Sequence, residues 1–562
     1  MAPERTPTET SPLLNNHNDT TFYEDPESHC ADSSDGREAT VDQPVESSHT
    51  APSIARPSLQ SQLKYIVPAI SVGVFMSAAD QTIIVASSGA IGTDLSALNL
   101  TSWIATSYFL ALTSFQPLYG KLSDIFGRKA CLLAAYSIFG AGCLLCGLAR
   151  NIYELIFARV FQGIGGGGMT TVASILLSDM VPLRDRGVWQ GLVNLVYATG
   201  SAVGAPLGGI LADSIGWRWA FIVQVPLSII ASIAVSLMLN IPSPADSGSC
   251  WKAKLRRIDL LGAATLIGAV LSLLLGLDRG SNVSWKLPIT IASLGVSGFL
   301  SALFVLVEIY VAAEPVMPGY ILFDRNFLAL YSSNFFGWAG WLSVLFYLPL
   351  YFQTVDGVSA TVAGLRLLPS ILASVSGSLL SGFIIKWTGR YYRLTVTAYA
   401  LLAMGCSLLF LFSSGVVKGS VTIPIMIGMA MAAFGNGLGV TATLIGLISH
   451  TTEENQAVVT ACSYLFRSLG SVIGLSLSST VIQQALRGRL RHEIPNGRDV
   501  SKIVNGVRQS LDFIKNLDPD MAEFVRACYG WSINKGLVFM FIIVSFALLS
   551  ACFCREKNVS RR

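Results

Sequence analysis

The chain has 562 residues, of which 52% are hydrophobic and only 13% are charged, and its formal net charge at pH 7 is +4. Soluble domains carry about 25% charged residues, so this composition excludes an ordinary soluble protein and predicts one that lies mostly in a lipid bilayer. The small net charge gives no indication of nucleic-acid binding, and we expect no metal and no cofactor.

The ten cysteines are expected to be buried and unreactive, not joined in a disulfide framework. Five of them lie in or at the ends of apolar stretches, where free cysteine behaves as a small hydrophobic residue: Cys131, Cys143, Cys146, Cys406 and Cys462. Cys143 and Cys146 have the CxxC spacing, but no second pair or histidine accompanies them.

Residues 1–62 are predicted to form a disordered cytoplasmic tail. They are rich in Ser, Thr, Pro, Asp, Glu and Asn, so they cannot bury enough surface to offset the entropy of ordering. No cleavable signal peptide is recognisable, so the first membrane helix is expected to direct insertion. The string ETSPLL, with Glu9, Leu13 and Leu14, resembles an acidic dileucine signal that sorting adaptors read on cargo for endosomes, lysosomes or vacuoles; a chance match is the alternative.

Fourteen apolar stretches follow, each near the roughly 20 residues that a membrane-spanning helix needs. They predict an all-α membrane protein with both chain ends on one side of the bilayer. The stretches lie at about 66–87, 102–119, 130–148, 153–177, 187–211, 217–240, 258–277, 288–311, 327–353, 361–385, 394–413, 421–448, 456–483 and 535–554.

The basic residues of the short loops indicate which side is the cytoplasm. They follow the second, fourth, sixth and tenth stretches: Lys121, Arg128, Lys129, Arg184, Arg186, Lys252, Lys254, Arg256, Arg257, Lys386, Arg390 and Arg393. A long loop at 484–534 is expected on the opposite, lumenal side, where long loops are exempt from the charge rule. Asn99 and Asn282 on that side fit the acceptor pattern for N-linked glycans, though both lie near the membrane.

Asp80 lies inside the first stretch, in FMSAADQTIIVASS. An ionised carboxylate is costly there and usually faces a water-filled cavity or a partner, so we favour a functional role over hydrogen bonding for packing. The Asp-x-Thr-Ile pattern from Asp80 to Ile83 resembles the first helix of fourteen-span drug:proton antiporters. The resemblance implies that the acid binds a proton or a cation.

The loop GKLSDIFGRK after the second stretch contains Gly120, Asp124, Gly127, Arg128 and Lys129. The glycines permit a sharp turn and close helix approach, and Asp124 is within reach of the basic residues, so the loop is suited to latch and release. It resembles the signature loop of the major facilitator superfamily, which implies that it helps to lock the cytoplasmic gate.

Arg159 lies in the fourth stretch, in LIFARVFQGIGGGG, and requires a carboxylate, carbonyl groups or water as partners. The segment resembles the fourth-helix motif of the same superfamily, whose arginine, with the following Gln162 and Gly163, is tied to proton coupling. A literal GxGxxG in this glycine run has no preceding strand, so we attribute it to helix packing.

The fifth stretch contains a motif of small residues with one proline, GSAVGAPLGG, with Gly200, Gly204, Pro206, Gly208 and Gly209. These residues predict a helix that bends and packs closely at the interface of the halves. The string resembles the antiporter motif, with Ala205 in place of a glycine; ordinary close packing is the alternative. Trp217-Arg218-Trp219, which opens the sixth stretch, is similar to the same subfamily and also suits an interfacial aromatic belt.

An internal repeat links the two ends of the chain. GFIIKWTGR, from Gly382 to Arg390, repeats the spacing of the first loop, with Lys386 in the place of Asp124. Two six-helix halves are implied. We therefore predict the major facilitator fold with a first half at 63–242, a linker and two inserted helices at 243–320, and a second half at 321–562.

In the second half, Arg467 and Asn436 are polar residues within apolar stretches, and each is expected either to line the cavity or to be structural. Four aromatic residues of the ninth stretch suit stacking on a cationic or aromatic substrate, with packing or lipid contact as the alternative: Trp338, Trp341, Tyr347 and Tyr351.

No Walker A motif is present, so transport is expected to be secondary and the protein is not expected to be an enzyme. Our hypothesis is a proton-coupled antiporter in which protonation of Asp80 competes with a cationic substrate at a central cavity shared with Arg159. The chain resembles fungal fourteen-span antiporters, in particular the vacuolar basic amino acid transporters of yeasts and multidrug exporters. This resemblance implies basic amino acid transport at the vacuolar membrane, with drug efflux at the plasma membrane or a non-transporting nutrient sensor as alternatives.

Overall fold

The structure is a computed structural model that describes residues 57–95, 101–239, 259–282, 285–311, 319, 324–358, 360–414, 421–452, 454–493 and 518–557. Several sequence predictions fall outside these residues: the sorting signal with Glu9, Leu13 and Leu14, the basic linker from Lys252 to Arg257, and the sequon at Asn99.

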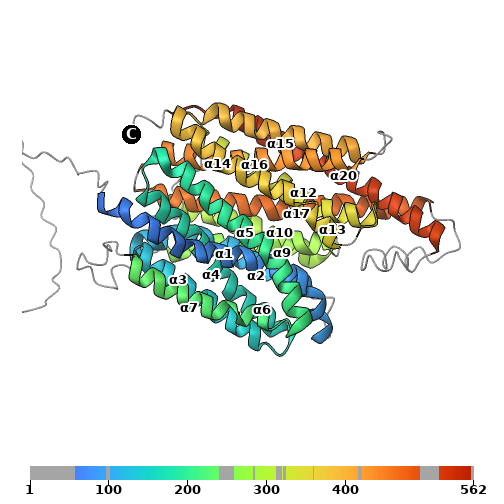
Figure 1. Ribbon diagram of the computed structural model, residues 1–562, viewed down its shortest axis with the longest axis horizontal. Coiled ribbons are helices and arrows are strands. Elements are labelled where there is room, and N and C mark those ends of the chain that lie inside the picture. The colour runs from blue at the N-terminus through green and yellow to red at the C-terminus, as the bar shows by residue number, and fades with distance from the viewer. Residues whose placement is uncertain are drawn as a thin grey trace, which may run out of the picture. The chain divides into compact units, whose positions relative to one another are not determined.

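The described residues form helices and contain no strand (Figure 1). The first set is α1 (Pro57–Asp94), α2 (Thr101–Phe126), α3 (Arg128–Leu148), α4 (Ile152–Met180), α5 (Leu183–Ser214), α6 (Trp219–Ile222) and α7 (Gln224–Met238). The hairpin pair α9 (Leu260–Asn282) and α10 (Pro288–Tyr310) follows. The second set is α12 (Arg325–Thr354), α13 (Ala360–Leu365), α14 (Leu368–Thr388), α15 (Tyr392–Ser413), α16 (Thr422–His450), α17 (Gln456–Glu493) and α20 (Pro519–Cys552).

Twelve spans in the described residues are long and apolar enough to cross a membrane, by length and composition. The two other predicted spans correspond to α2 and α9. Their hydropathy is lower because α2 carries polar side chains such as Ser114 and Gln116, which are buried within the protein, and because the apolar part of α9, Leu261–Leu277, is short. Fourteen spans are compatible with this arrangement, and that number stays a prediction.

The packing of the second set repeats that of the first. In the first set α4 packs between α2 and α3 and α1 packs on α5, while in the second set α16 packs between α14 and α15 and α12 packs on α17. Between the sets, α2 contacts α17 and α5 contacts α14. Helix α14 occupies the same position in the second set as α2 does in the first, and α17 corresponds in the same way to α5. The two contacts are therefore equivalent, as expected if a twofold axis relates the sets.

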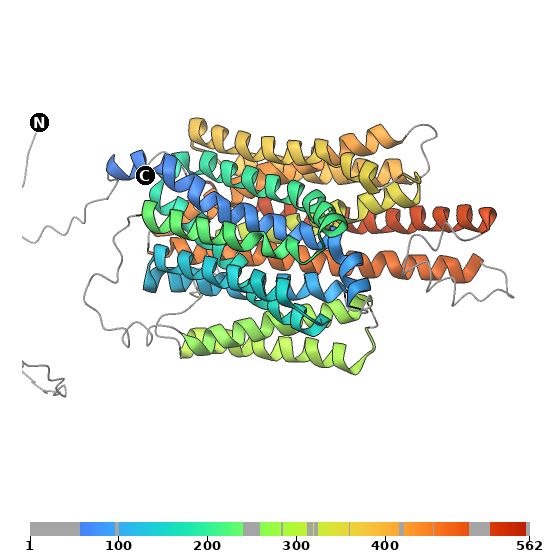
Figure 2. The same ribbon diagram turned by 60° about the horizontal axis from the view of Figure 1, so that its bottom comes forward.

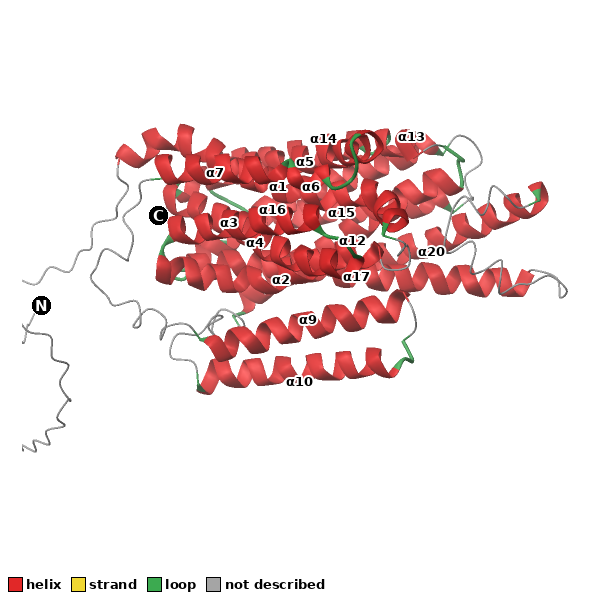
Figure 3. Ribbon diagram, turned by 90° about the horizontal axis from the view of Figure 1, so that it is seen from below, coloured by secondary structure: helices red, strands yellow, loops and turns green. Residues whose placement is uncertain are grey.

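The hairpin pair packs beside the two sets. Figures 2 and 3 show α9 and α10 side by side at the edge of the bundle, with α9 nearer to it, and α9 contacts both α2 and α17. Large apolar side chains of α10 are exposed, among them Phe299 at 68% and Leu306 at 53%. Such a face suits contact with lipid rather than water. The domain boundaries at 63–242, 243–320 and 321–562 stay a prediction.

Helix ends differ from the sequence prediction on the lumenal side. The parts of the expected loop 484–534 that the structure describes are helical at both ends, because α17 continues to Glu493 and α20 begins at Pro519. The parts of α17 and α20 beyond the apolar stretches carry charged residues such as Arg487 and Glu523. Hydropathy falls where a helix leaves the bilayer, so it does not reveal that these helices continue further. The predicted tail likewise ends earlier than residue 62, because α1 begins at Pro57, and proline is favoured in the first turn of a helix.

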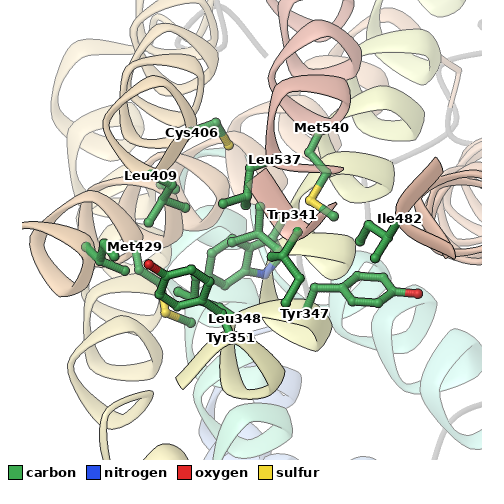
Figure 4. Packing of buried hydrophobic residues seen from close by; sticks show 14 of the residues in the cluster. Trp341, Tyr347, Leu348, Tyr351, Cys406, Leu409, Met429, Ile482, Leu537 and Met540 are labelled. Atoms are coloured by element: carbon green, nitrogen blue, oxygen red, sulfur yellow. The ribbon is translucent and has the colours of Figure 1, made fainter. Parts of the chain in front are cut away.

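The core of the second set is apolar and tightly filled. Figure 4 shows side chains of α12, α15, α16, α17 and α20 that converge there, including Trp341, Cys406, Met429, Ile482 and Leu537. Three of the four aromatic residues predicted to stack on a substrate belong to this core: Trp341, Tyr347 and Tyr351. Their burial favours packing, which the sequence left open as the alternative.

Glycines allow α4 to approach its neighbours at backbone distance. A Cβ atom at Gly165 would lie 2.5 Å from the backbone nitrogen of Phe139 in α3. In the second set a Cβ atom at Gly435 of α16 would lie 2.5 Å from the backbone nitrogen of Leu402 in α15. Backbone atoms cannot move aside as a flexible side chain can, so the glycine run serves helix packing, as the sequence suggested.

We expect Gly165→Ala to destabilise the protein by about 1–3 kcal/mol, because the added methyl group forces α3 and α4 apart. Thermal unfolding of the purified protein in detergent measures this. Gly298→Ala in α10 is the matched control, since nothing lies within 4 Å of its added Cβ atom and alanine is the better helix former by about 1 kcal/mol. Equal melting temperatures for the two variants would contradict the packing role.

Candidate functional site

Asp80 of α1 and Arg159 of α4 form an ion pair inside the first set. Nη1 of Arg159 lies 2.5 Å from Oδ2 of Asp80, and the side chains are 1% and 0% exposed, respectively. Removing each ion from water costs several kcal/mol, which mutual attraction only partly offsets, so a buried pair contributes little net stability. The pair therefore points to a function that needs the charges.

Two glutamines complete the surroundings of the Asp80 carboxylate. Nε2 of Gln162 in α4 donates to Oδ1 of Asp80 at 2.8 Å, and Nε2 of Gln224, the first residue of α7, donates to the same oxygen at 3.1 Å. All the described partners of this carboxylate, with Arg159, are therefore donors. Each of these contacts is a hydrogen bond that a carboxylate oxygen accepts.

The Gln162 amide is held at both ends. Its Oε1 accepts from Nη1 of Arg159 at 2.6 Å and from the thiol of Cys146 at 3.5 Å, while its Nε2 also donates to Sγ of Cys143 at 3.0 Å. All five cysteines that the sequence placed in apolar stretches are buried. Cys143 and Cys146, however, contact the site, which the sequence analysis did not foresee because helical i, i+3 spacing alone does not identify the neighbouring helix.

Arg159 has partners that do not depend on the charge of Asp80. Its Nε donates to the carbonyl of Ile104 at 3.1 Å, and its guanidinium carbon lies 4.4 Å from the centre of the Tyr108 ring. The hydroxyl of Tyr108 lies 3.0 Å from Oγ of Ser77 on α1. If Asp80 became neutral, Arg159 would keep the carbonyl of Ile104, the side-chain oxygen of Gln162 and the cation–π contact. The site can therefore tolerate protonation of the acid.

Arg467 of α17 lies at a separate, small cavity between the two sets. The cavity leaves about 10 Å³ for the centre of a water-sized sphere, roughly the room that one water molecule needs, and it is lined by Gln190, Asn334, Val440, Leu444, Ser463, Tyr464 and Arg467. The Arg467 guanidinium carbon lies 3.9 Å from the centre of the Trp338 ring. Among the described residues no carboxylate lies within 4 Å of it, and the rings of Trp338, Tyr464 and Tyr197 lie within about 6 Å of its guanidinium carbon.

One acceptor atom in the cavity lining and one donor atom beside it have no partner in the described residues. Oδ1 of Asn334, which lines the cavity, is buried and has no hydrogen bond, and the same holds for Nε1 of Trp338, whose ring contacts Arg467 beside the cavity. Nδ2 of Asn334 donates to Ser463. Polar contacts also cross between the sets here, since Gln190 of α5 donates to the hydroxyl of Tyr464 at 3.3 Å. Sequence reasoning missed Asn334, although a polar residue within an apolar stretch was the available signal.

The predicted site residues therefore divide between two places. Asp80 and Arg159 are together, but neither lines the cavity of Arg467, which differs from the expectation of one shared central cavity. Asn436 of α16 is buried and also lies outside the cavity lining, one helical turn before Val440.

A short chain of contacts connects the ion pair to the cavity. Gln81 follows Asp80 on α1, and its Oε1 accepts from the hydroxyl of Tyr197 in α5 at 2.9 Å. The ring of Tyr197 in turn lies 5.7 Å from the Arg467 guanidinium carbon. Because consecutive residues of a helix point about 100° apart, α1 presents Asp80 to the first set and Gln81 to the cavity side.

The loop after α2 forms a network of charged groups. Nη1 of Arg128 lies 2.6 Å from Oδ1 of Asp124, and its Nε lies 2.8 Å from Oδ2 of Asp179 at the end of α4. Gly127 has φ of +90°, a conformation that favours glycine, and Lys129 donates to the carbonyl of Ser236 in α7 at 2.7 Å. At Gly120 a Cβ atom would lie 2.6 Å from the Cβ atom of Ala461 in α17, so this glycine allows the two sets to meet.

The second copy of the loop contacts the first set directly. Nζ of Lys386 lies 2.9 Å from Oδ1 of Asp185, and Nε of Arg184 donates to the carbonyl of Lys386 at 2.7 Å. Here a Cβ atom on Gly187 of α5 would lie 2.8 Å from the Cα atom of Gly382 in α14. Lys386, the residue that replaces the acid of the first loop, thus joins the sets.

We expect Asp185→Lys to shift the protein away from the state closed at this end, because two cations would then face each other. Both side chains are partly exposed, so the pair contributes about 0.2–1 kcal/mol, which corresponds to a change of up to about fivefold in the closed population. Distances between spin labels at the ends of α5 and α14 measure that population. The double variant Asp185→Lys with Lys386→Asp should restore it; failure of the exchange to do so would count against a latch.

The antiporter motif of α5 packs on α1. Cβ atoms at Gly200 and Gly208 would lie 2.5 Å from the carbonyl oxygen of Phe75 and 2.6 Å from that of Ile83, and Gly204 makes the same close approach one turn between them. Pro206 is exposed and Gly209 is partly buried. Helix α5 lies at the interface of the halves, against α14, as expected. Its glycines at a spacing of four, however, form one stripe, and that stripe faces α1 of the same set.

The Trp217-Arg218 pair holds the end of α1 that is predicted to face the lumen. Arg218 and the indole nitrogen of Trp217 donate to Oδ2 of Asp94 at 2.8 and 3.1 Å. These two hydrogen bonds hold the pKa of the Asp94 carboxyl below its ordinary value. Asn282 is the last residue of α9, and its side chain is outside the part that the structure describes.

Known proteins are similar to this chain in sequence and in fold. The family model described as Major Facilitator Superfamily matches residues 70–475. The vacuolar membrane amino acid uptake transporter fnx2 of Schizosaccharomyces pombe is 36% identical over 88% of this chain and 84% of its own. The multidrug resistance protein fnx1 of the same yeast is 37% identical over 87% and 91%, and vacuolar basic amino acid transporter 2 of Saccharomyces cerevisiae is 35% identical over 80% and 97%.

Among solved structures, the proton:xylose symporter XylE superposes with a TM-score of 0.56 at 16% identity, and the match covers 89% of this chain and 97% of that one. At this identity the likeness shows the fold alone.

Proposed function

Because this chain belongs to the major facilitator superfamily and is a multi-pass membrane transporter, we propose that it is a proton-coupled antiporter that moves basic amino acids into the vacuole. The observation that carries the proposal is the buried pair of Asp80 and Arg159, whose acid is surrounded by donors and whose base retains other acceptors. A carboxylate in such a place can gain and lose a proton while the fold stays intact.

Arg467 supports an amino acid as the substrate. A cation with no carboxylate within 4 Å in the described residues, next to the free Oδ1 of Asn334, suits the α-carboxylate and a donor group of an amino acid. Two relatives are named for vacuolar amino acid transport, which supports both the substrate class and the vacuolar membrane. A sorting adaptor that reads Glu9, Leu13 and Leu14 would deliver the protein there.

Drug efflux at the plasma membrane is the second candidate, and the relative named for multidrug resistance favours it. Of the four aromatic residues of α12 that were expected to serve a drug, Trp338 alone contacts the cavity residue Arg467. The basic amino acid is therefore the better supported substrate.

Uptake into proteoliposomes with an acidic interior tests the function. We expect accumulation of radiolabelled lysine, arginine or histidine that stops when a protonophore removes the gradient. Liposomes without the protein are the control. Absence of amino acid uptake, together with proton-driven movement of a cationic dye, would favour the exporter instead.

A further inference from the structure

Gln224 has one buried polar atom that has no hydrogen-bond partner when Asp80 is ionised. The side chain is 5% exposed, and its Nε2 donates to Oδ1 of Asp80 and to the carbonyl of Ala220 at 3.0 Å. Its Oε1 has no hydrogen-bond partner. A buried acceptor without a partner is costly and rare in folded proteins, so this atom calls for an explanation.

The protonated form of Asp80 needs an acceptor that its present partners do not offer. Oδ2 is held by the guanidinium of Arg159, so a proton taken from water forms its O–H bond at Oδ1. There it meets two amide nitrogens, those of Gln162 and Gln224, and both are donors. The new O–H group therefore requires one of these amides to present its oxygen.

Gln162 cannot turn without loss, because both of its ends are engaged by Arg159, Asp80 and the two cysteines. Gln224 gives up its hydrogen bond to the carbonyl of Ala220, from which the incoming Oε1 must turn aside, and gains one from the Asp80 hydroxyl. The terminal torsion of glutamine has a broad, roughly twofold profile, so the two orientations occupy the same space. Gln224 is therefore the amide free to turn.

We propose that the Gln224 amide turns with the protonation state of Asp80, donating Nε2–H to the carboxylate and accepting the O–H of the acid at Oε1. The proposal rests on Asp80 as the proton site of the proposed function. Loss of the proton restores the carboxylate and returns the amide to the orientation seen here. Gln224 is a positioning residue that acts through Asp80.

Among the residues that the structure describes, no other group facing Asp80 is suited to accept a hydrogen bond from the protonated acid. The charged or titratable side chains around it are Arg159 of α4, Cys143 and Cys146 of α3 and Tyr108 of α2. The described part of α6 and α7 carries no charged side chain, and Tyr197 of α5 faces Gln81. Tyr108 is occupied by Ser77.

Infrared difference spectroscopy of the purified protein between high and low pH tests the proposal without transport. The C=O stretch of a protonated carboxyl lies at lower frequency when its O–H is hydrogen-bonded, and Asp80→Asn identifies the band by removing it. We expect Gln224→Met to shift this band to higher frequency. Ser228→Ala, one turn further along α7, is the matched control, since it removes a buried hydrogen bond to the carbonyl of Tyr136 and should leave the band unchanged.

A band at the same frequency in Gln224→Met would overturn the role of Gln224, even if proton-driven transport were intact. A wild-type protein with no Asp80 band at any pH would instead overturn the proton site itself, and with it the proposed function. Gln224→Leu serves as the second apolar replacement if Gln224→Met does not fold, and it should give the same shift.

Discussion

Asp80→Asn is expected to abolish proton-driven accumulation of the substrate, reducing it to the level of liposomes without a pH gradient. The amide keeps the shape of the acid but cannot gain and lose a proton. Arg159 keeps Gln162 and the carbonyl of Ile104 as acceptors, so the variant should still fold. Exchange of labelled for unlabelled substrate across the membrane, which needs no gradient, should continue.

The measurement is the initial rate of uptake with and without a pH gradient, corrected for the amount of protein. Asp94→Asn is the control, because that acid lies on the same helix but is half exposed and pairs with Arg218. Near-normal gradient-driven uptake by Asp80→Asn would reject the proton role of the acid.

Arg467→Gln is expected to raise the KM for lysine roughly 30-fold, with a much smaller change in kcat. The estimate corresponds to about 2 kcal/mol for the loss of one partner from a buried, charge-assisted contact. Arg467→Lys should recover part of the affinity, because it keeps the charge but not the planar contact with Trp338.

Uptake measured over a range of lysine concentrations provides these constants. Arg393→Gln is the matched control, since Arg393 is exposed on α15 and lies outside the cavity lining. If lysine and its decarboxylated analogue cadaverine lost affinity equally in Arg467→Gln, Arg467 would not be the partner of the substrate carboxylate.

Much of the architecture follows from the sequence, because a bilayer imposes strong rules on a chain. Apolar length predicted the spans, and the repeated loop predicted that the second set of helices follows the first. Asp80 and Arg159 were identified as costly charges in apolar surroundings. Their direct contact could not be predicted, because it depends on the rotation of α1 and α4 about their own axes. Neither helix has an amphipathic pattern that fixes this rotation.

Other features depend on contacts that a single sequence does not record. Cys143 and Cys146 have an inconspicuous spacing, and only the position of α3 beside α4 brings them to Gln162. The glycine motif of α5 indicated that another helix packs closely on it, but it did not identify that helix as α1. Helix ends on the lumenal side escaped prediction because α17 and α20 continue as charged helices beyond the apolar spans.

The position of α9 restricts how the two sets can move. Oγ of Ser476 in α17 donates to the carbonyl of Leu277 in α9 at 3.0 Å, while Arg279 of α9 lies 5.1 Å from the centre of the Trp103 ring in α2. If the two sets rock against each other during transport, the contact between α2 and α17, on which α9 packs, opens and closes. In each transport cycle α9 must then slide along α2 or α17, and α10 must move through the surrounding lipid. Because lipid resists that movement, we expect the turnover rate to fall as membrane viscosity rises.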